Sequence, residues 1–207
     1  MRETTVTIAL DGGAADRDIA IDAIRETWGL LDGPESLVVV RALAGMGKSH
    51  LVHGWIADRR RRGINDVVSI PARELGAPLG EQLRAGQHRV LVIDGADALS
   101  APQLDELYAL LLADPALKAV LCVATVRGVA RVGAPGGLTV REIGAARLKI
   151  AEEELASVLE GWSAAGLAIE QGNAIHALTD GWPGLAHLLA SEVARVGTGP
   201  ADAAAAV

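Results

Sequence analysis

The feature that most constrains this chain is a glycine-rich stretch that follows a short run of β-branched residues. Residues 38–40 predict a buried strand, and residues 42–49, Ala-Leu-Ala-Gly-Met-Gly-Lys-Ser, lead from it into an amphipathic pattern. Strand, glycine-rich turn and helix are, in this order, the parts of a phosphate-binding P-loop. Gly45 and Gly47 let main-chain N–H groups approach phosphate oxygens where a Cβ would block them. A flexible connector is the alternative, but a connector lacks the strand before it and the helix after it.

The residues after the glycines suit the other parts of a polyphosphate site. A helix beginning near Lys48 would direct its unpaired N–H groups and its positive dipole end at an anion. Lys48 would add a full charge toward the terminal phosphates, and the Ser49 hydroxyl suits Mg²⁺. We therefore expect these nucleotide-binding residues: Ala44, Gly45, Met46, Gly47, Lys48, Ser49 and His50. His50 and His53 would share a helix face, but no neighbouring carboxylate or cysteine completes a metal set, so we interpret them as surface residues rather than metal ligands.

An aspartate further along the chain is the second candidate site residue. Residues 90–93 are four consecutive apolar residues, which predict a strand buried on both faces. Asp94 follows at the expected carboxyl end of this strand, where ligands bind in open α/β sheets. After a P-loop, this position favours Asp94 as the acid that holds Mg²⁺ together with Ser49, although an aspartate in a tight turn is the alternative. Asp97 could polarise the attacking water or cap the following structure.

A further apolar run brings a cation to the same region. Residues 119–125 predict another buried strand, and Arg127 follows it. Because the carboxyl ends of parallel strands share one edge of the sheet, Arg127 would lie on the edge that carries Asp94. Arg127 could contact the γ-phosphate, or it could form a surface salt bridge. With shorter strand patterns at residues 64–72 and 138–143, the chain predicts an α/β fold.

After residue 147 the chain changes character, because strand patterns end and helical patterns follow. Residues 152–154 are three glutamates, which suit a helix N-terminus. A second helix is predicted over about residues 170–178 and a third over residues 185–196, with Gly-Trp-Pro-Gly between them. The alanine-rich end that follows is typical of a frayed terminus or a linker.

Taken together, these motifs resemble one family. Residues 42–49 are similar to the Ala-Pro-Ala-Gly-Tyr-Gly-Lys-Thr loop of STAND ATPases, the signal-transduction ATPases with numerous domains. Within that class the chain most resembles the ATPase part of the large ATP-dependent LuxR-type transcriptional regulators of the maltose-activator kind. Further similarities lie at Trp55, Leu148, residues 152–154 and the Leu-Thr-Asp-Gly-Trp-Pro-Gly-Leu stretch at residues 178–185. The Gly-Trp-Pro element is the most specific of these, and the resemblance spans roughly residues 37–190.

The resemblance implies an ATP/ADP switch module. Its fold would be a P-loop NTPase with three α/β/α layers and a mainly parallel five-stranded sheet, followed by a small helical subdomain. Pro183 would approach the bound base or ribose, and Arg127 matches the arginine that the family carries after the fourth strand. One position departs from the family, which usually has a second acid directly after the aspartate matched by Asp94, where this chain has Gly95. Loss of a water-polarising carboxylate affects the chemical step more than binding, so we expect slow Mg²⁺-dependent ATP hydrolysis.

We expect the chain to divide into four segments. These are a lead-in strand and helix at residues 1–33, a nucleotide-binding domain at 34–146, a helical subdomain at 147–199 and a tail at 200–207. Residues 138–142, Leu-Thr-Val-Arg-Glu, resemble the opening of the LuxR-type DNA-binding helix-turn-helix, but the recognition helix that should follow is missing. The net charge of −7 also argues against a surface that coats nucleic acid. We therefore expect no direct nucleic-acid contact from this chain.

Patterns that the sequence lacks lead to expectations about its partners and its compartment. The sequence has no run of about 18 apolar residues and no signal-peptide core, and its single cysteine cannot form an internal disulfide. We expect a cytoplasmic chain without membrane contact, whose partners are the nucleotide and, through it, a second copy or downstream regulatory domains. The alternative function is an interaction module that binds nucleotide without turnover. A small-molecule kinase would need an acceptor pocket and an arginine-bearing lid, and the sequence shows no clear lid.

Overall fold

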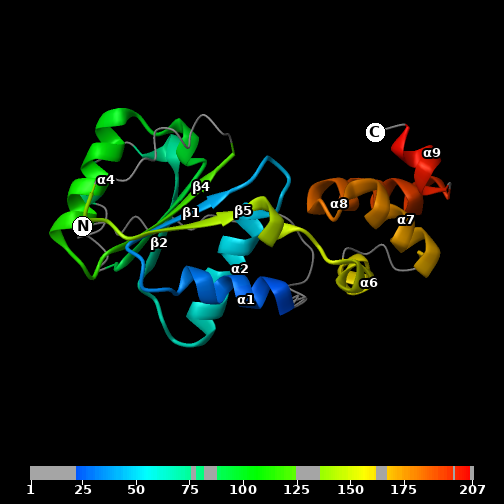
Figure 1. The fold of residues 1–207 in the computed structure, drawn as a ribbon, viewed down its shortest axis with the longest axis horizontal. Helices are drawn as coiled ribbons and strands as arrows, with labels where there is room; N and C mark the ends of the chain where they lie inside the picture. The colour runs from blue at the N-terminus through cyan, green and yellow to red at the C-terminus, as the bar shows by residue number, and fades with distance from the viewer. Residues whose placement is uncertain are drawn as a thin grey trace, which may run out of the picture.

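The structure, a computed structural model, describes residues 22–75, 78–81, 88–124, 136–161, 167–197 and 199–205. The described chain forms an α/β part followed by a group of helices (Figure 1). The strand expected near the N-terminus and the candidate residue Arg127 lie outside the described residues.

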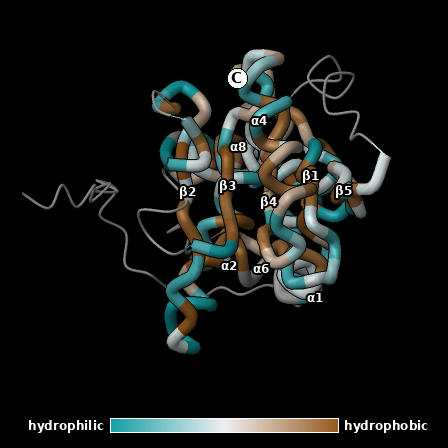
Figure 2. Tube along the Cα trace, turned by 90° about the vertical axis from the view of Figure 1, so that its left-hand side faces the viewer, coloured by the Kyte–Doolittle hydropathy of each residue, from teal (hydrophilic) through white to brown (hydrophobic). Residues whose placement is uncertain are grey.

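Within the described residues, five parallel strands form one sheet in the order β2-β3-β4-β1-β5, which Figure 2 shows. The strands are β1 (Leu37–Arg41), β2 (Val67–Pro71), β3 (Val90–Asp94), β4 (Lys118–Val123) and β5 (Val140–Gly144). The predicted α/β fold with a parallel five-stranded sheet is confirmed. Strand β4 lies between β1 and β3, so the strand before the P-loop and the strand before Asp94 are separated by one strand.

Each face of the sheet is covered by helices, because side chains alternate between the two faces along every strand. Helix α4 (Ala101–Ala113) covers one face, and its leucines pack against Leu37 and Val39 of β1. Helices α1 (Asp22–Leu31) and α2 (Lys48–Arg61) cover the other face, where Val38 and Val40 lie. Figure 1 shows these three layers. The sequence has no phenylalanine, and leucine, valine, isoleucine and alanine supply most of the core.

Short 3-10 helices and one capping box complete the α/β part. The 3-10 helices are η1 (Ala72–Glu74), η2 (Ala96–Ala98) and η3 (Ala145–Leu148). Helix α4 begins at a capping box, in which Ser100 N donates to Gln103 Oε1 at 2.9 Å and Gln103 N donates to Ser100 Oγ at 3.4 Å. The two bonds satisfy main-chain and side-chain groups that would otherwise be unpaired at the helix start.

The group of helices after β5 has its own core. It contains α6 (Glu152–Gly161), α7 (Ile169–Thr179), α8 (Pro183–Val196) and α9 (Pro200–Ala204). Its buried members include Leu155, Leu159, Ile175, Leu189 and Val193. In the part of the chain that the structure describes, no helix is both long and apolar enough to cross a bilayer.

Two local predictions for this helical part were wrong. Helix α8 begins at Pro183 rather than Leu185, because proline suits the first helical position, where an N–H has no intrahelical partner. The end predicted to be frayed forms α9, and Ala203 in it is 2% exposed and packs into the helical core. The expected four-segment division itself stays a prediction.

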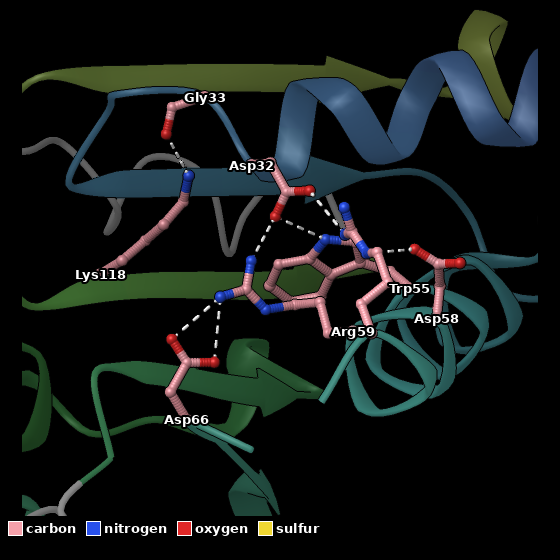
Figure 3. Close-up of polar contacts among 8 residues, drawn as sticks. Asp32, Gly33, Trp55, Asp58, Arg59, Asp66 and Lys118 are labelled. Atoms are coloured by element: carbon pink, nitrogen blue, oxygen red, sulfur yellow. Dashed lines mark hydrogen bonds and ion pairs between the residues drawn. The ribbon is translucent and has the colours of Figure 1, made fainter. Parts of the chain in front are cut away.

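Arg59, near the C-terminal end of α2, joins three segments of the α/β part (Figure 3). Its Nη2 donates to both carboxylate oxygens of Asp66, at 3.0 and 2.9 Å, and its Nη1 donates to Asp32 Oδ1. The guanidinium carbon lies 5.2 Å from the centroid of the Trp55 ring, and Trp55 Nε1 donates to the same Asp32 oxygen at 3.0 Å. Asp32 therefore fixes the end of α1 to α2.

We expect Asp32→Ala to lower the free energy of unfolding by about 1–3 kcal/mol, because it leaves the N–H of the fully buried Trp55 without its acceptor. The matched control is Asp58→Ala, whose carboxylate pairs with Arg61 and Arg62, both about half exposed, and it should cost less than about 1 kcal/mol. Urea unfolding of both variants measures the difference. Equal losses would contradict the role assigned to Asp32.

Candidate functional site

The loop between β1 and α2 has the backbone conformation that its glycines permit. Gly45 has φ +78° and Gly47 has φ +83°, both in the left-handed region that side chains disfavour. Gly47 is the N-cap of α2. Ala42 N donates to Val123 O at 3.2 Å, which ties the start of the loop to the end of β4. The loop is therefore a defined turn at the carboxyl edge of the sheet.

The side chain of Lys48 folds back over this loop. Lys48 is 9% exposed, and its Nζ donates to Ala42 O at 2.7 Å and to Leu43 O at 3.0 Å. An ammonium has three donors, so two hold the loop and one remains for an anion. The first turn of α2 carries no acidic residue, so no carboxylate of that turn offsets the positive end of the helix dipole.

Ser49 and Asp94 lie together, as the sequence predicted. Ser49 Oγ donates to Asp94 Oδ2 at 2.7 Å, across the end of β4. The other oxygen of Asp94 accepts the N–H of Gly95 at 2.9 Å. A hydroxyl and a carboxylate at one place fit Mg²⁺, which binds few protein oxygens and keeps waters and substrate phosphates as its other ligands. Ser49 and Asp94 are therefore suited to hold the ion.

The residue after Asp94 is open to solvent. Gly95 has φ +69°, and a Cβ at this position would have no other atom within 4 Å. The second acid that the resemblance leads one to expect would thus have room here, but it would need a left-handed backbone. Among the described residues, no group of three or more histidine, cysteine, aspartate or glutamate side chains could hold a metal ion.

Asp97 has a clear structural contact. Its Oδ2 accepts the N–H of Ala124 at 2.6 Å, so the side chain links the turn after β3 to the end of β4. This contact is not a cap of the structure that follows Asp97, because α4 is capped by Ser100, and a catalytic role for Asp97 stays a prediction. His50 is exposed in the first turn of α2, and its role in binding also stays a prediction.

The sequence pattern missed a direct main-chain contact between the helical part and the loop. Gly184 N donates to Gly45 O at 2.8 Å. Next to it, Pro183 Cγ lies 3.8 Å from where a Cβ of Gly47 would be. Pro183 thus lies against the P-loop, and its contact with a base or ribose stays a prediction. The available signal was local: Trp182 precedes the helix but its side chain cannot accept a hydrogen bond, so α8 needs an acceptor from elsewhere.

The turn that carries Pro183 is held by the connection from β5. Ile150 N donates to Gly181 O at 2.9 Å, and His176 Nε2 lies 3.0 Å from Ile150 O. Because a carbonyl only accepts, Nε2 carries the proton in this contact. Lys149 forms an ion pair with Asp180, and its hydrogen bond lowers the pKa of that carboxyl. The turn is thus bonded to the chain that joins the two parts.

Several solved structures have a similar fold. A Walker-type ATPase of Pyrococcus abyssi matches with TM-score 0.59 at 14% identity, over 89% of this chain and 69% of that one. Drosophila ORC, solved bound to DNA, matches with TM-score 0.56 at 18% identity, over 89% and 56%. AMPPCP-bound DnaA from Aquifex aeolicus matches with TM-score 0.50 at 16% identity, over 74% and 54%.

The chain has the fold of a P-loop NTPase domain. No family model matches the sequence, and no curated protein matches it significantly. At identities of 14–18%, the likeness concerns the fold alone. The matches span only part of the length of the three solved chains.

Beneath the site of this P-loop NTPase domain lies one buried thiol. Cys122 of β4 is fully buried and pairs in register with Asp94. Burial raises the pKa of Cys122 to about 12; the Asp94 carboxylate adds to this, and the Lys48 ammonium opposes it.

We expect the Cys122 thiol to resist alkylation in the folded protein. At pH 8, a pKa of about 12 leaves roughly one thiol in ten thousand as thiolate, and the side chain is buried in the core between the sheet and helices α1 and α2. Iodoacetamide labelling followed by mass spectrometry should give modification only after denaturation in urea. Rapid labelling of the native protein would show that β4 does not lie under the loop as described.

Proposed function

We propose that this domain binds ATP or ADP with Mg²⁺ and acts as a nucleotide-operated switch that hydrolyses ATP slowly. The observation that supports this most is the 2.7 Å hydrogen bond from Ser49 to Asp94, beside a loop that Lys48 anchors. The main-chain N–H groups from Gly45 to Ser49 hold the phosphates, and Lys48 neutralises their charge. Bound Mg²⁺ supplies further charge neutralisation, with Ser49 and Asp94 as its protein ligands.

The proposal also assigns this switch a place in a larger protein. The Gly-Trp-Pro turn and the loop sequence support an ATPase part of a LuxR-type transcriptional regulator. Nucleotide binding then biases how the helical part sits on the α/β part, and hydrolysis resets it. In this scheme the partners are the nucleotide and either regulatory domains or a second copy, with no membrane or direct nucleic-acid contact, in the cytoplasm. Of the matched structures, DnaA was solved with AMPPCP, which agrees with a nucleotide role for this fold.

We expect Lys48→Ala to abolish the rise in melting temperature that Mg²⁺-ATP or Mg²⁺-ADP gives the wild-type protein. A ligand at about 100 times its dissociation constant stabilises the native state by about 2.7 kcal/mol, and loss of the lysine removes the main charge that holds it. The control is Lys118→Ala, because Lys118 lies at the amino end of β4, whereas the candidate site lies at the carboxyl ends of the strands. The rise in melting temperature with nucleotide should persist in this variant. An unchanged shift in Lys48→Ala would refute the site.

Phosphate release separates the switch from the alternative, an interaction module that binds nucleotide without turnover. We expect the wild-type protein to release phosphate from Mg²⁺-ATP slowly, because Gly95 supplies no carboxylate to polarise water. Asp94→Asn should reduce the release to background, since the Mg²⁺ ligand is weakened. A coupled phosphate assay at saturating ATP measures both. If the wild-type rate equals that of Asp94→Asn while binding persists, the alternative is correct.

A further inference from the structure

Helix α8 begins without a side-chain cap. Its N-cap residue is Trp182, which makes no capping hydrogen bond. Pro183 has no N–H, so Gly184 is the first helical residue with a free donor. That donor is used on Gly45 O of the P-loop, at 2.8 Å. The carbonyl oxygen of Gly45 therefore caps the N-terminus of α8, a role that a serine or aspartate side chain commonly has.

The accepted hydrogen bond fixes one peptide plane of the loop. The peptide between Gly45 and Met46 is trans and planar, so its C=O and its N–H point in opposite directions. With Gly45 O held by Gly184, the N–H of Met46 points the opposite way and donates to Leu43 O at 3.3 Å. Lys48 Nζ donates to the same Leu43 oxygen at 3.0 Å. The Met46 N–H and the Lys48 ammonium therefore share one acceptor of the loop, so the bond from Gly184 fixes a peptide that belongs to the loop's own hydrogen-bonded frame.

The contact leaves no room for a side chain on Gly184. A Cβ there would lie 2.7 Å from Gly45 O and 3.0 Å from Gly45 Cα, so the backbone of one part would have to move. On the other side, a Cβ on Gly45 would lie 3.2 Å from Trp182 Nε1. Two glycines let the helical part approach the loop closely enough for the main chains to bond.

We propose that the Gly184 amide is a positioning group for the phosphate cradle. By holding Gly45 O, it fixes the Gly45–Met46 peptide of the loop, and docking of the helical part and binding of the nucleoside diphosphate strengthen each other. The coupling is reciprocal, as linkage requires. The inference rests on the proposed function, and it names a route by which nucleotide occupancy reaches the helical part.

The test compares two glycine-to-alanine variants in the full chain. Gly184→Ala should weaken Mg²⁺-ADP binding by about tenfold or more in calorimetric titration, because its methyl group separates Gly184 N from Gly45 O. Gly172→Ala is the matched control: it adds the same methyl group in α7, where it meets only Leu159 at an ordinary 3.5 Å, and its affinity should stay within about twofold of wild type.

Hydrogen exchange of the nucleotide-free proteins distinguishes a loosened P-loop from a helical part that is merely less stable. Gly184→Ala should speed exchange in the loop at residues 43–47, and Gly172→Ala should not. Trp182→Asp is a second variant, because the aspartate offers α8 its own cap and so competes with Gly45 O while keeping the helix. It too should weaken Mg²⁺-ADP binding and loosen the loop.

Two results would overturn the inference. One is Mg²⁺-ADP affinity within twofold of wild type in both Gly184→Ala and Trp182→Asp. The other is weaker binding with unchanged exchange at residues 43–47, which would place the effect outside the phosphate cradle. Failure of the wild-type protein to bind Mg²⁺-ADP at all is a different result: it rejects the proposed function, and the exchange comparison still decides whether Gly184 restrains the loop.

Discussion

The hydrogen bond from Ser49 to Asp94 is the interaction on which the candidate site depends. Ser49 lies in the first turn of α2, just after the loop that follows β1, and Asp94 ends β3. Because β1 and β3 are not neighbours, the two side chains meet across β4, whose end is level with theirs. That register places a hydroxyl, a carboxylate and the Lys48 ammonium around one glycine-rich turn. Its chemistry suits a polyphosphate with a divalent cation, since positive charge, main-chain donors and hard oxygen ligands then lie together.

The helical part is hydrogen-bonded to this turn through a main-chain group, the N–H of Gly184. The family resemblance drew attention to Pro183, but the hydrogen bond is made by Gly184. Apart from lacking a Cβ, a residue that contributes only its main-chain N–H is not distinguished by its side chain. The sequence pattern therefore identifies the turn but not the atom that donates. The same contact gives α8 its missing cap and orients one donor of the P-loop, which links the stability of the helical part to the state of the site.

Local features of the fold and of the site could be predicted from the sequence, and so could the pairing of Ser49 with Asp94, because both belong to recognisable P-loop motifs, whereas other long-range contacts could not. The P-loop, the apolar strands and the capping box at Ser100 depend on residues within a few positions of one another, so their patterns are visible in the chain. The order of the strands, the contact of Asp97 with Ala124 and the contact of Arg59 with Asp32, 27 residues away, depend on the assembled sheet. Helix α9 was missed because alanine-rich ends carry little amphipathic pattern, and Ala203 is buried only by its helical neighbours.

Calorimetric titration of the nucleotide-free wild-type chain with ADP, first with Mg²⁺ and then with a chelator, tests the central claim most directly. If Gly45 to Ser49 and Asp94 form one nucleotide site, binding saturates at one ADP per chain, and its affinity falls when Mg²⁺ is removed. No saturable binding at millimolar ADP, with or without Mg²⁺, would contradict the account.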